Sequence, residues 1–136
     1  MALAASRLAK EPWQCELAVW LACRDPSIFG LGVVGFDLDD LGWDASCIER
    51  ERAFLLAVLQ SALRHEGWSL LTYAPPPELT EDNLRKLRRL LVDYVLPPTP
   101  GARAWAWQEQ APASFTPCAR CGVYLHIAGC VVCNAT

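Results

Sequence analysis

The chain contains no run of apolar residues approaching the roughly 18 that a membrane-spanning helix requires. Its first residues, Met1 to Lys10, lack the long uncharged stretch and cleavage site of a secretory signal. A strong excess of charge is missing too, because the formal net charge is −3. That balance excludes a general electrostatic attraction to nucleic acid or anionic membranes. These absences predict a cytoplasmic protein with no membrane partner.

The composition favours a substantial hydrophobic core. The 136 residues are 53% hydrophobic and include six tryptophans, against a usual hydrophobic share of about 45–50%. A chain of this length buries roughly two thirds of its unfolded surface in a single core. We therefore expect one body over residues 1–112, with some of the apolar surface left to face a partner.

The first half of the body predicts two helices and a strand. Pro12 suits the first position of a helix, and apolar residues then recur at helical spacing until Asp25. Residues 28–36 are apolar and interrupted by glycine, which is typical of a short buried strand. Ser46 and Glu49 form a capping-box pattern, so we expect a helix to begin there and to run to about Gly67.

The second half predicts two further strands and a third helix. Residues 68–73 have the pattern of a strand, which the following prolines end. Thr80 is expected to cap a helix whose core-facing residues are Leu84, Leu87, Leu91, Tyr94 and Val95. Residues 103–109 alternate tryptophan with alanine, which predicts a last strand. The expected fold is α+β (or α/β), with three main helices interleaved with short strands in one compact domain.

Four cysteines near the C-terminus follow a C-x2-C-x8-C-x2-C pattern: Cys118, Cys121, Cys130 and Cys133. The two-residue spacing lets each pair direct both sulfurs at one centre, and four thiolates suit a tetrahedral zinc ion. Iron suits the same ligands and is the less favoured alternative. The sequence thus predicts a small metal-binding hairpin over residues 113–136, packed on the body. The other three cysteines, Cys15, Cys23 and Cys47, are expected to be small buried core residues.

The first cysteine pair continues as C-x2-C-G-x-Y, through Gly122 and Tyr124. This run resembles the knuckle of zinc ribbons and rubredoxin-like modules. The resemblance implies backbone amides that point at sulfur and a closed shell of four thiolates around a structural ion. It covers about sixteen residues, from Cys118 to Cys133, and does not extend to the body.

Two patterns in the segment that ends at Leu41 point to enzymes but lack their context. Gly30, Gly32 and Gly35 spell G-x-G-x-x-G without the preceding strand that a dinucleotide site needs. Residues 33–41 resemble the first motif of haloacid-dehalogenase-like phosphatases, which implies Asp37 as nucleophile and Asp39 as general acid/base. That family's later motifs are missing, so we expect no enzyme, with a phosphatase-like hydrolase as the third alternative.

The residues expected to contact a partner fall in three groups. Asp39, Asp40 and Trp43 form a candidate recognition loop, for which the alternative is a solvated loop that caps or pairs with neighbouring elements. Arg85, Arg88 and Arg89 form a basic patch. Trp105 and Trp107 share a face of the last predicted strand.

These features favour a small non-enzymatic protein-binding module, such as an adaptor, regulator or inhibitor, with a structural zinc site. Tryptophan and arginine are enriched at protein interfaces, and this predicts another protein or a second copy as the partner. The alternative is a nucleic-acid-binding regulator that uses the zinc hairpin and the patch from Arg85 to Arg89, with tryptophans stacking on bases.

Overall fold

The computed structural model describes residues 1–24, 36–71, 76–103, 114–125 and 129–133. Its helices are α1 (Ala2–Leu8), α2 (Pro12–Cys23), α3 (Ile48–Leu63) and α4 (Pro77–Asp93). Two short 3-10 turns cover Leu38–Leu41 and Trp68–Leu70. Every helix within these ranges is too short or too polar to cross a bilayer.

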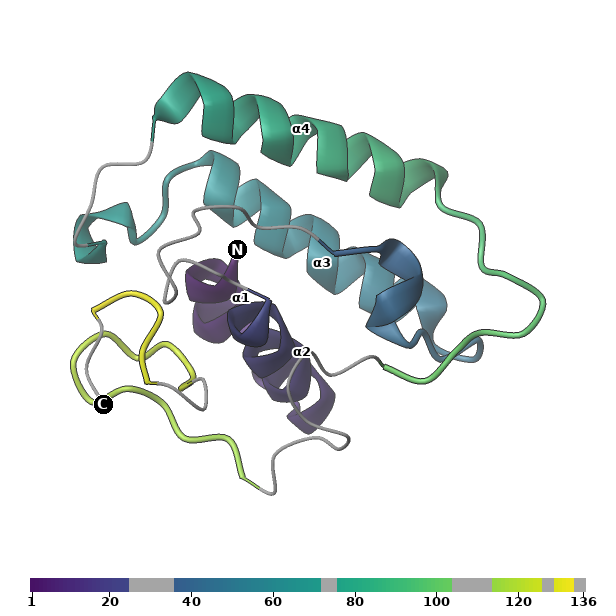
Figure 1. Cartoon of the computed structure of the whole chain (residues 1–136), viewed down its shortest axis with the longest axis horizontal. Coiled ribbons are helices and arrows are strands. Elements are labelled where there is room, and N and C mark those ends of the chain that lie inside the picture. The colour runs from purple at the N-terminus through teal and green to yellow at the C-terminus, as the bar shows by residue number, and fades with distance from the viewer. Residues whose placement is uncertain (25–35, 72–75, 104–113, 126–128, 134–136) are drawn as a thin grey trace.

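The helices form two pairs that share one core. Helix α1 contacts both α2 and α3, and α4 packs along α3. Figure 1 shows α3 and α4 side by side, with α1 and α2 on the other side of α3 and the C-terminal cysteine segment next to α1. Trp20, Leu59 and Val58 have no exposed surface, and buried residues of the cysteine segment belong to the same core.

Helix α2 begins at Pro12, as the sequence predicts. Its start is fixed by a capping box that was not predicted, in which Glu11 and Gln14 accept from each other's backbone amides. The Gln14 side chain accepts from the Glu11 amide at 3.1 Å, and the Trp13 indole donates to the Glu11 carboxylate at 2.8 Å. Local polar contacts therefore define the helix start.

Helix α1 was not predicted. Its sequence is alanine-rich and short, and a seven-residue helix is marginal without tertiary support. Here that support comes from burial, because five consecutive residues from Ala2 to Ser6 are buried against α2 and α3.

Helix α3 begins at Ile48, close to the predicted start, but the capping contacts differ from the predicted box. The Ser46 hydroxyl donates to the Asp44 carboxylate at 2.6 Å instead of accepting from the Glu49 amide. Glu51 accepts from the Asp44 amide at 3.2 Å. The helix has 16 residues and ends at Leu63, so it is about 24 Å long and ends before the predicted Gly67.

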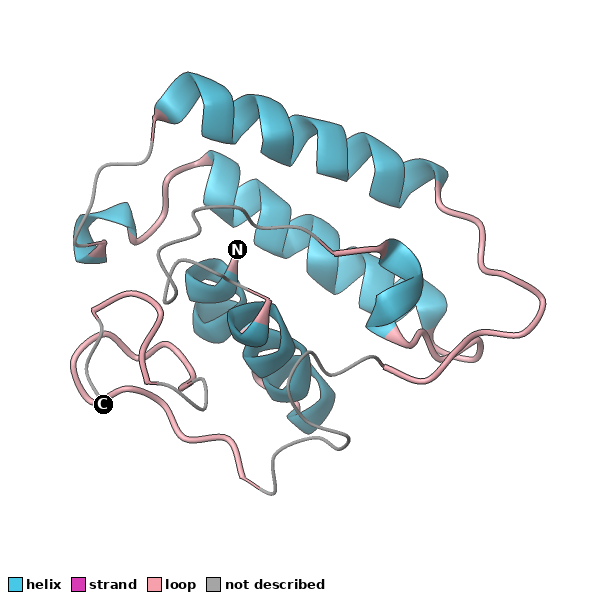
Figure 2. Cartoon of the chain, in the orientation of Figure 1, coloured by secondary structure: helices cyan, strands magenta, loops and turns pink. Residues whose placement is uncertain are grey.

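The prediction of an α+β fold with interleaved strands is not confirmed, because the described residues form four helices and almost no strand structure (Figure 2). Trp68–Leu70 is a 3-10 turn, with Leu70 N–H donating to Gly67 O at 2.9 Å, so the strand predicted there is wrong for these residues. A strand needs a neighbour to accept its ladder bonds, and this turn satisfies its own backbone instead. The strands predicted over 28–36 and 103–109 lie almost wholly outside the described residues.

Helix α4 begins at Pro77, three residues before the predicted cap Thr80, because proline suits the first helical turn. Leu84 and Leu91 are buried against the core, in agreement with the sequence pattern. Val95 lies beyond the helix and is 83% exposed, so its predicted core position is wrong. The apolar spacing of the sequence continues past Asp93, but the helix ends at that residue and the backbone is in an extended conformation at Tyr94.

Glu51 is expected to make stability depend on pH. Its side chain is only 8% exposed, and this burial raises the pKa of the carboxyl above its ordinary value. The folded state therefore binds this proton more readily than the unfolded state, so stability falls as pH rises from the unfolded pKa through the folded pKa. Glu51→Gln keeps an oxygen for the Asp44 amide and carries no charge.

Urea unfolding of Glu51→Gln and the parent protein at pH 5 and pH 7.5 measures this effect. The variant should gain stability relative to the parent on going from pH 5 to pH 7.5. Taking the difference at each pH cancels the titration of groups that the two proteins share. If Glu51→Gln instead loses stability relative to the parent between pH 5 and pH 7.5, the prediction is contradicted. Such a loss would show that the folded state favours the ionised Glu51 carboxylate over its protonated form.

Candidate metal centre

The first cysteine pair lies on a tight turn closed by backbone hydrogen bonds. Cys118 N–H donates to Val123 O at 2.8 Å, and Gly122 N–H donates to Cys118 O at 2.9 Å. An antiparallel bridge joins Pro117 to Tyr124 on either side of the turn. Gly122 has φ of 68°, a conformation that glycine adopts without the steric cost of a side chain. The glycine of the C-x2-C-G pattern thus lets the chain reverse directly after the second sulfur.

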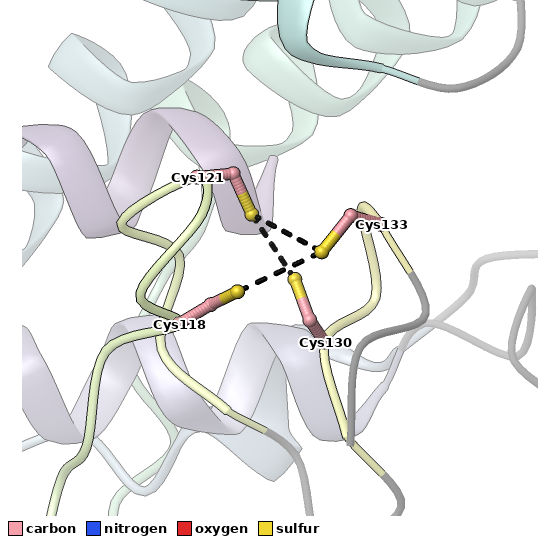
Figure 3. A group of neighbouring side chains, drawn as sticks. All are labelled: Cys118, Cys121, Cys130 and Cys133. Carbon is pink, nitrogen blue, oxygen red and sulfur yellow. Dashed lines mark hydrogen bonds between the residues drawn. The ribbon is translucent and has the colours of Figure 1, made fainter.

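The turn brings Cys118 and Cys121 to the second pair, Cys130 and Cys133. All four sulfurs lie within 4.8 Å of one another, and Figure 3 shows the four side chains converging on one point. The separations are 3.2 Å for Cys121 to Cys130, 3.6 Å for Cys118 to Cys133 and 3.9 Å for Cys121 to Cys133. Four sulfurs at about 2.3 Å from a tetrahedral centre lie about 3.8 Å apart. The residues therefore fit a four-thiolate metal site.

The same separations exclude covalent pairing in this structure. A disulfide joins sulfurs at about 2.05 Å, well below the shortest contact here, and all seven cysteines are free thiols. Cys118 and Cys130 are buried, and Cys121 and Cys133 are half-buried. Each C-x2-C pair thus contributes one buried and one half-buried cysteine to the cluster.

The local electrostatics differ among the thiols. The backbone amides of Arg120 and Cys121 lower the pKa of Cys118 to about 6. Burial raises the pKa of Cys121 to about 12 and also raises that of Cys130. Amides that point at sulfur stabilise the thiolate, which is the form that binds a metal.

The cysteine hairpin, by which we mean residues 114–125 and 129–133, is held on the helical body by Tyr124. The Tyr124 amide donates to the Ser6 hydroxyl of α1 at 3.1 Å, and its phenol donates to the Cys15 thiol of α2 at 3.0 Å. Val123 and Val131 are buried in the common core. The position of the sulfur cluster is therefore coupled to two helices from the other end of the chain.

The candidate recognition loop makes contacts within the chain. Asp39 accepts from the Tyr94 phenol at 2.6 Å, and Asp40 forms an ion pair with Arg24 at 3.7 Å. Burial, together with the bond to Asp39, raises the pKa of Tyr94 to about 12. Trp43 is 5% exposed and stacks on Tyr94 with ring centroids 5.4 Å apart. These contacts match the capping and pairing alternative, and a partner-binding role for the loop stays a prediction.

The aspartates of the phosphatase-like pattern also have structural contacts. The Asp37 carboxylate accepts from the Asp39 amide at 3.1 Å and so caps the 3-10 turn Leu38–Leu41. Asp39 is the residue bound to Tyr94. The proposed nucleophile and acid/base therefore serve a turn and a side-chain contact here, and their catalytic roles stay untested expectations.

The basic patch is partly neutralised within its own helix. Arg85 pairs with Glu81, and Lys86 pairs with Asp82 at 2.6 Å, each at i,i+4 spacing. Arg88 and Arg89 are exposed on the same helix. Trp105 and Trp107, the remaining candidate partner contacts, lie outside the described residues.

Sequence reasoning missed the residues that support these sites. Ser6 and Cys15 hold Tyr124 but lie 118 and 109 positions from it in the chain. Cys15 is half-buried rather than fully buried, as are Cys23 and Cys47. Arg103 donates to Leu41 O at 2.8 Å and to the Glu16 carboxylate at 2.9 Å. No local pattern marks contacts at such separations.

Comparison with known proteins does not assign this chain to a family. No family model matches the chain, and neither the curated proteins nor the solved structures contain a match. The class of site therefore rests on its geometry. Four cysteines on two C-x2-C turns form a cluster that can hold a metal ion, in a mostly helical protein.

Proposed function

We propose that this chain is a small non-enzymatic protein-binding module whose four cysteines hold one structural zinc ion. The observation that carries the metal assignment is the convergence of four thiol sulfurs within 4.8 Å. Zinc is favoured over iron because a closed tetrahedron of four cysteine thiolates is a standard structural zinc site. When bound, the ion supplies bonding that crosslinks the two cysteine turns.

The residues of the site support a structural role for the ion. Four thiolates complete the usual coordination number, which leaves no position for a substrate or an activated water. Tyr124 and Val123 connect the cluster to α1, α2 and the core. Metal-binding free energy then acts as folding energy for a hairpin too small to have a core of its own.

Apolar side chains at the surface support the protein-binding part of the proposal. Among the described residues, the large hydrophobic side chains that remain exposed are Leu70, Leu79, Leu90, Val92 and Val95. Four of these five lie on α4 or just after it, so the exposed apolar surface is concentrated on one element. Seven free thiols and no disulfide are consistent with a reducing compartment, for which we propose the cytoplasm.

Elemental analysis of the purified, untagged protein tests the metal assignment. We expect about one zinc per chain, because one tetrahedral site takes one ion. Less than half an equivalent of metal after purification without chelators would contradict the proposal. An equivalent of iron in place of zinc would keep the structural role and correct the identity of the ion.

A further inference from the structure

One face of α4 carries a short seam of the kind that pairs with another helix. Leu79 and Leu90 are each 62% exposed. They are separated by eleven positions, about three helical turns, and Asn83 and Lys86 lie between them on the same face. The resulting spacing of four, three and four residues is that of a coiled-coil seam. Leu84 and Leu91 are buried on a different face of α4, which packs along α3 at the edge of the molecule (Figure 1).

The charges of α4 are separated along its length. The acidic residues of its first half are Glu78, Glu81 and Asp82, and the basic residues that follow are Arg85, Lys86, Arg88 and Arg89, with a further acidic residue, Asp93, at the last helical position. In a parallel pair of such helices, like charges would face each other. In an antiparallel pair, the acidic part of each helix faces the basic part of the other. The helix is therefore complementary to itself across a two-fold axis, as an isologous interface requires.

We propose that α4 binds α4 of a second copy of this chain in an antiparallel pair. A two-fold axis between Leu84 and Arg85 brings Leu79 against Leu90 of the second copy and Asn83 against Lys86 of the second copy. In the same register, the Asp82 carboxylate, which pairs with Lys86 of its own helix, also lies beside Arg89 of the second copy. The two-fold axis repeats this contact on the other side. The proposal names the partner of the protein-binding module and rests on that part of the proposed function.

The proposed interface is small, and its size limits the expected affinity of the dimer. Stable protein interfaces bury about 1,600 Å² in total, more than a single helix pair with two leucines from each copy provides. We therefore expect a reversible dimer in which the Asp82 contacts set orientation and the leucines supply most of the buried apolar surface.

Sedimentation velocity of the zinc-loaded full chain, over a concentration series, measures this equilibrium. Asp82→Arg and Arg89→Asp should each weaken dimerisation by roughly tenfold or more, because each places like charges at both symmetric contacts. The double variant, with both changes, should restore most of the parent affinity. Arg64→Asp is the matched control, because it reverses an exposed arginine on another part of the surface and should leave dimerisation unchanged.

Circular dichroism and zinc content are recorded for every variant, so that loss of fold or metal is separated from loss of pairing. A parent chain that stays monomeric at about 1 mM, well above the Kd of most specific complexes, would overturn the proposal. A dimer unaffected by either single reversal would overturn it as well, and so would one that the double variant fails to restore. A monomer with one zinc would overturn the pairing and leave the structural zinc proposal intact.

Discussion

Replacing Cys130 with alanine is expected to abolish stoichiometric zinc binding and to lower the free energy of unfolding by about 3 kcal/mol or more. Apparent zinc-binding free energies in small zinc-dependent folds are on the order of 10–16 kcal/mol, and a three-thiolate shell retains only part of that. Cys130 is 1% exposed and belongs to the common core. Its loss therefore affects the packing of the hairpin as well as the metal.

Cys23→Ala is the matched control for this prediction. Cys23 is half-buried on α2 and lies outside the cluster, and burial raises the pKa of its thiol to about 11. This variant also loses one cysteine, yet it should keep one zinc and lose only about 1 kcal/mol, as typical substitutions do. Metal content and urea unfolding are measured for both variants. Equal metal content in Cys130→Ala and the parent would contradict the assignment.

The loss of Cys130 should also be detectable far from the metal. Tyr124 joins the hairpin to Ser6 and Cys15, so release of the hairpin removes both contacts. We expect the NMR amide signals of α1 and α2 around these residues to shift in Cys130→Ala, and those near the middle of α4 to shift much less.

Replacing Trp20 with alanine is the second change with a large expected effect, a loss of about 3–5 kcal/mol of stability, as is usual for buried aromatic residues. Trp20 has no exposed surface. Its ring packs edge-on against Phe36 at 5.1 Å, and the Arg24 guanidinium lies 4.9 Å from its centre. The substitution therefore leaves a cavity and removes a cation–π contact.

Val95→Ala serves as the comparison, because Val95 is 83% exposed and should change stability by less than about 0.5 kcal/mol. Both variants are unfolded in urea with saturating zinc, so that metal loss does not enter the difference. A loss below about 1 kcal/mol for Trp20→Ala would mean that the site collapses around the missing ring, and that Trp20 does not organise the core as described.

The helices were predictable where their signals are local. Pro12 and the apolar spacing that follows it fix α2, and the same kind of pattern predicts α3 and α4. The strand predicted from Trp68 failed because β-rich composition specifies a strand only when another strand lies beside it. Helix α1 escaped prediction because its short alanine-rich sequence becomes a helix through burial against α2 and α3.

The candidate site was likewise predictable from the sequence only where its signals are local. The sulfur cluster follows from two C-x2-C turns, so spacing alone was enough to bring Cys118 and Cys121 to one centre. The link from Tyr124 to Cys15 depends on how the hairpin lies on α2, which no local pattern encodes. Trp43 is similar, because its burial follows from stacking on Tyr94, 51 positions further along the chain.

X-ray absorption at the zinc edge of the untagged protein measures the central claim most directly. The account predicts four sulfur neighbours at about 2.3 Å and no oxygen or nitrogen in the first shell, as in closed structural sites. A first shell that contains a water oxygen, or fewer than four sulfurs, would contradict a purely structural centre formed by Cys118, Cys121, Cys130 and Cys133.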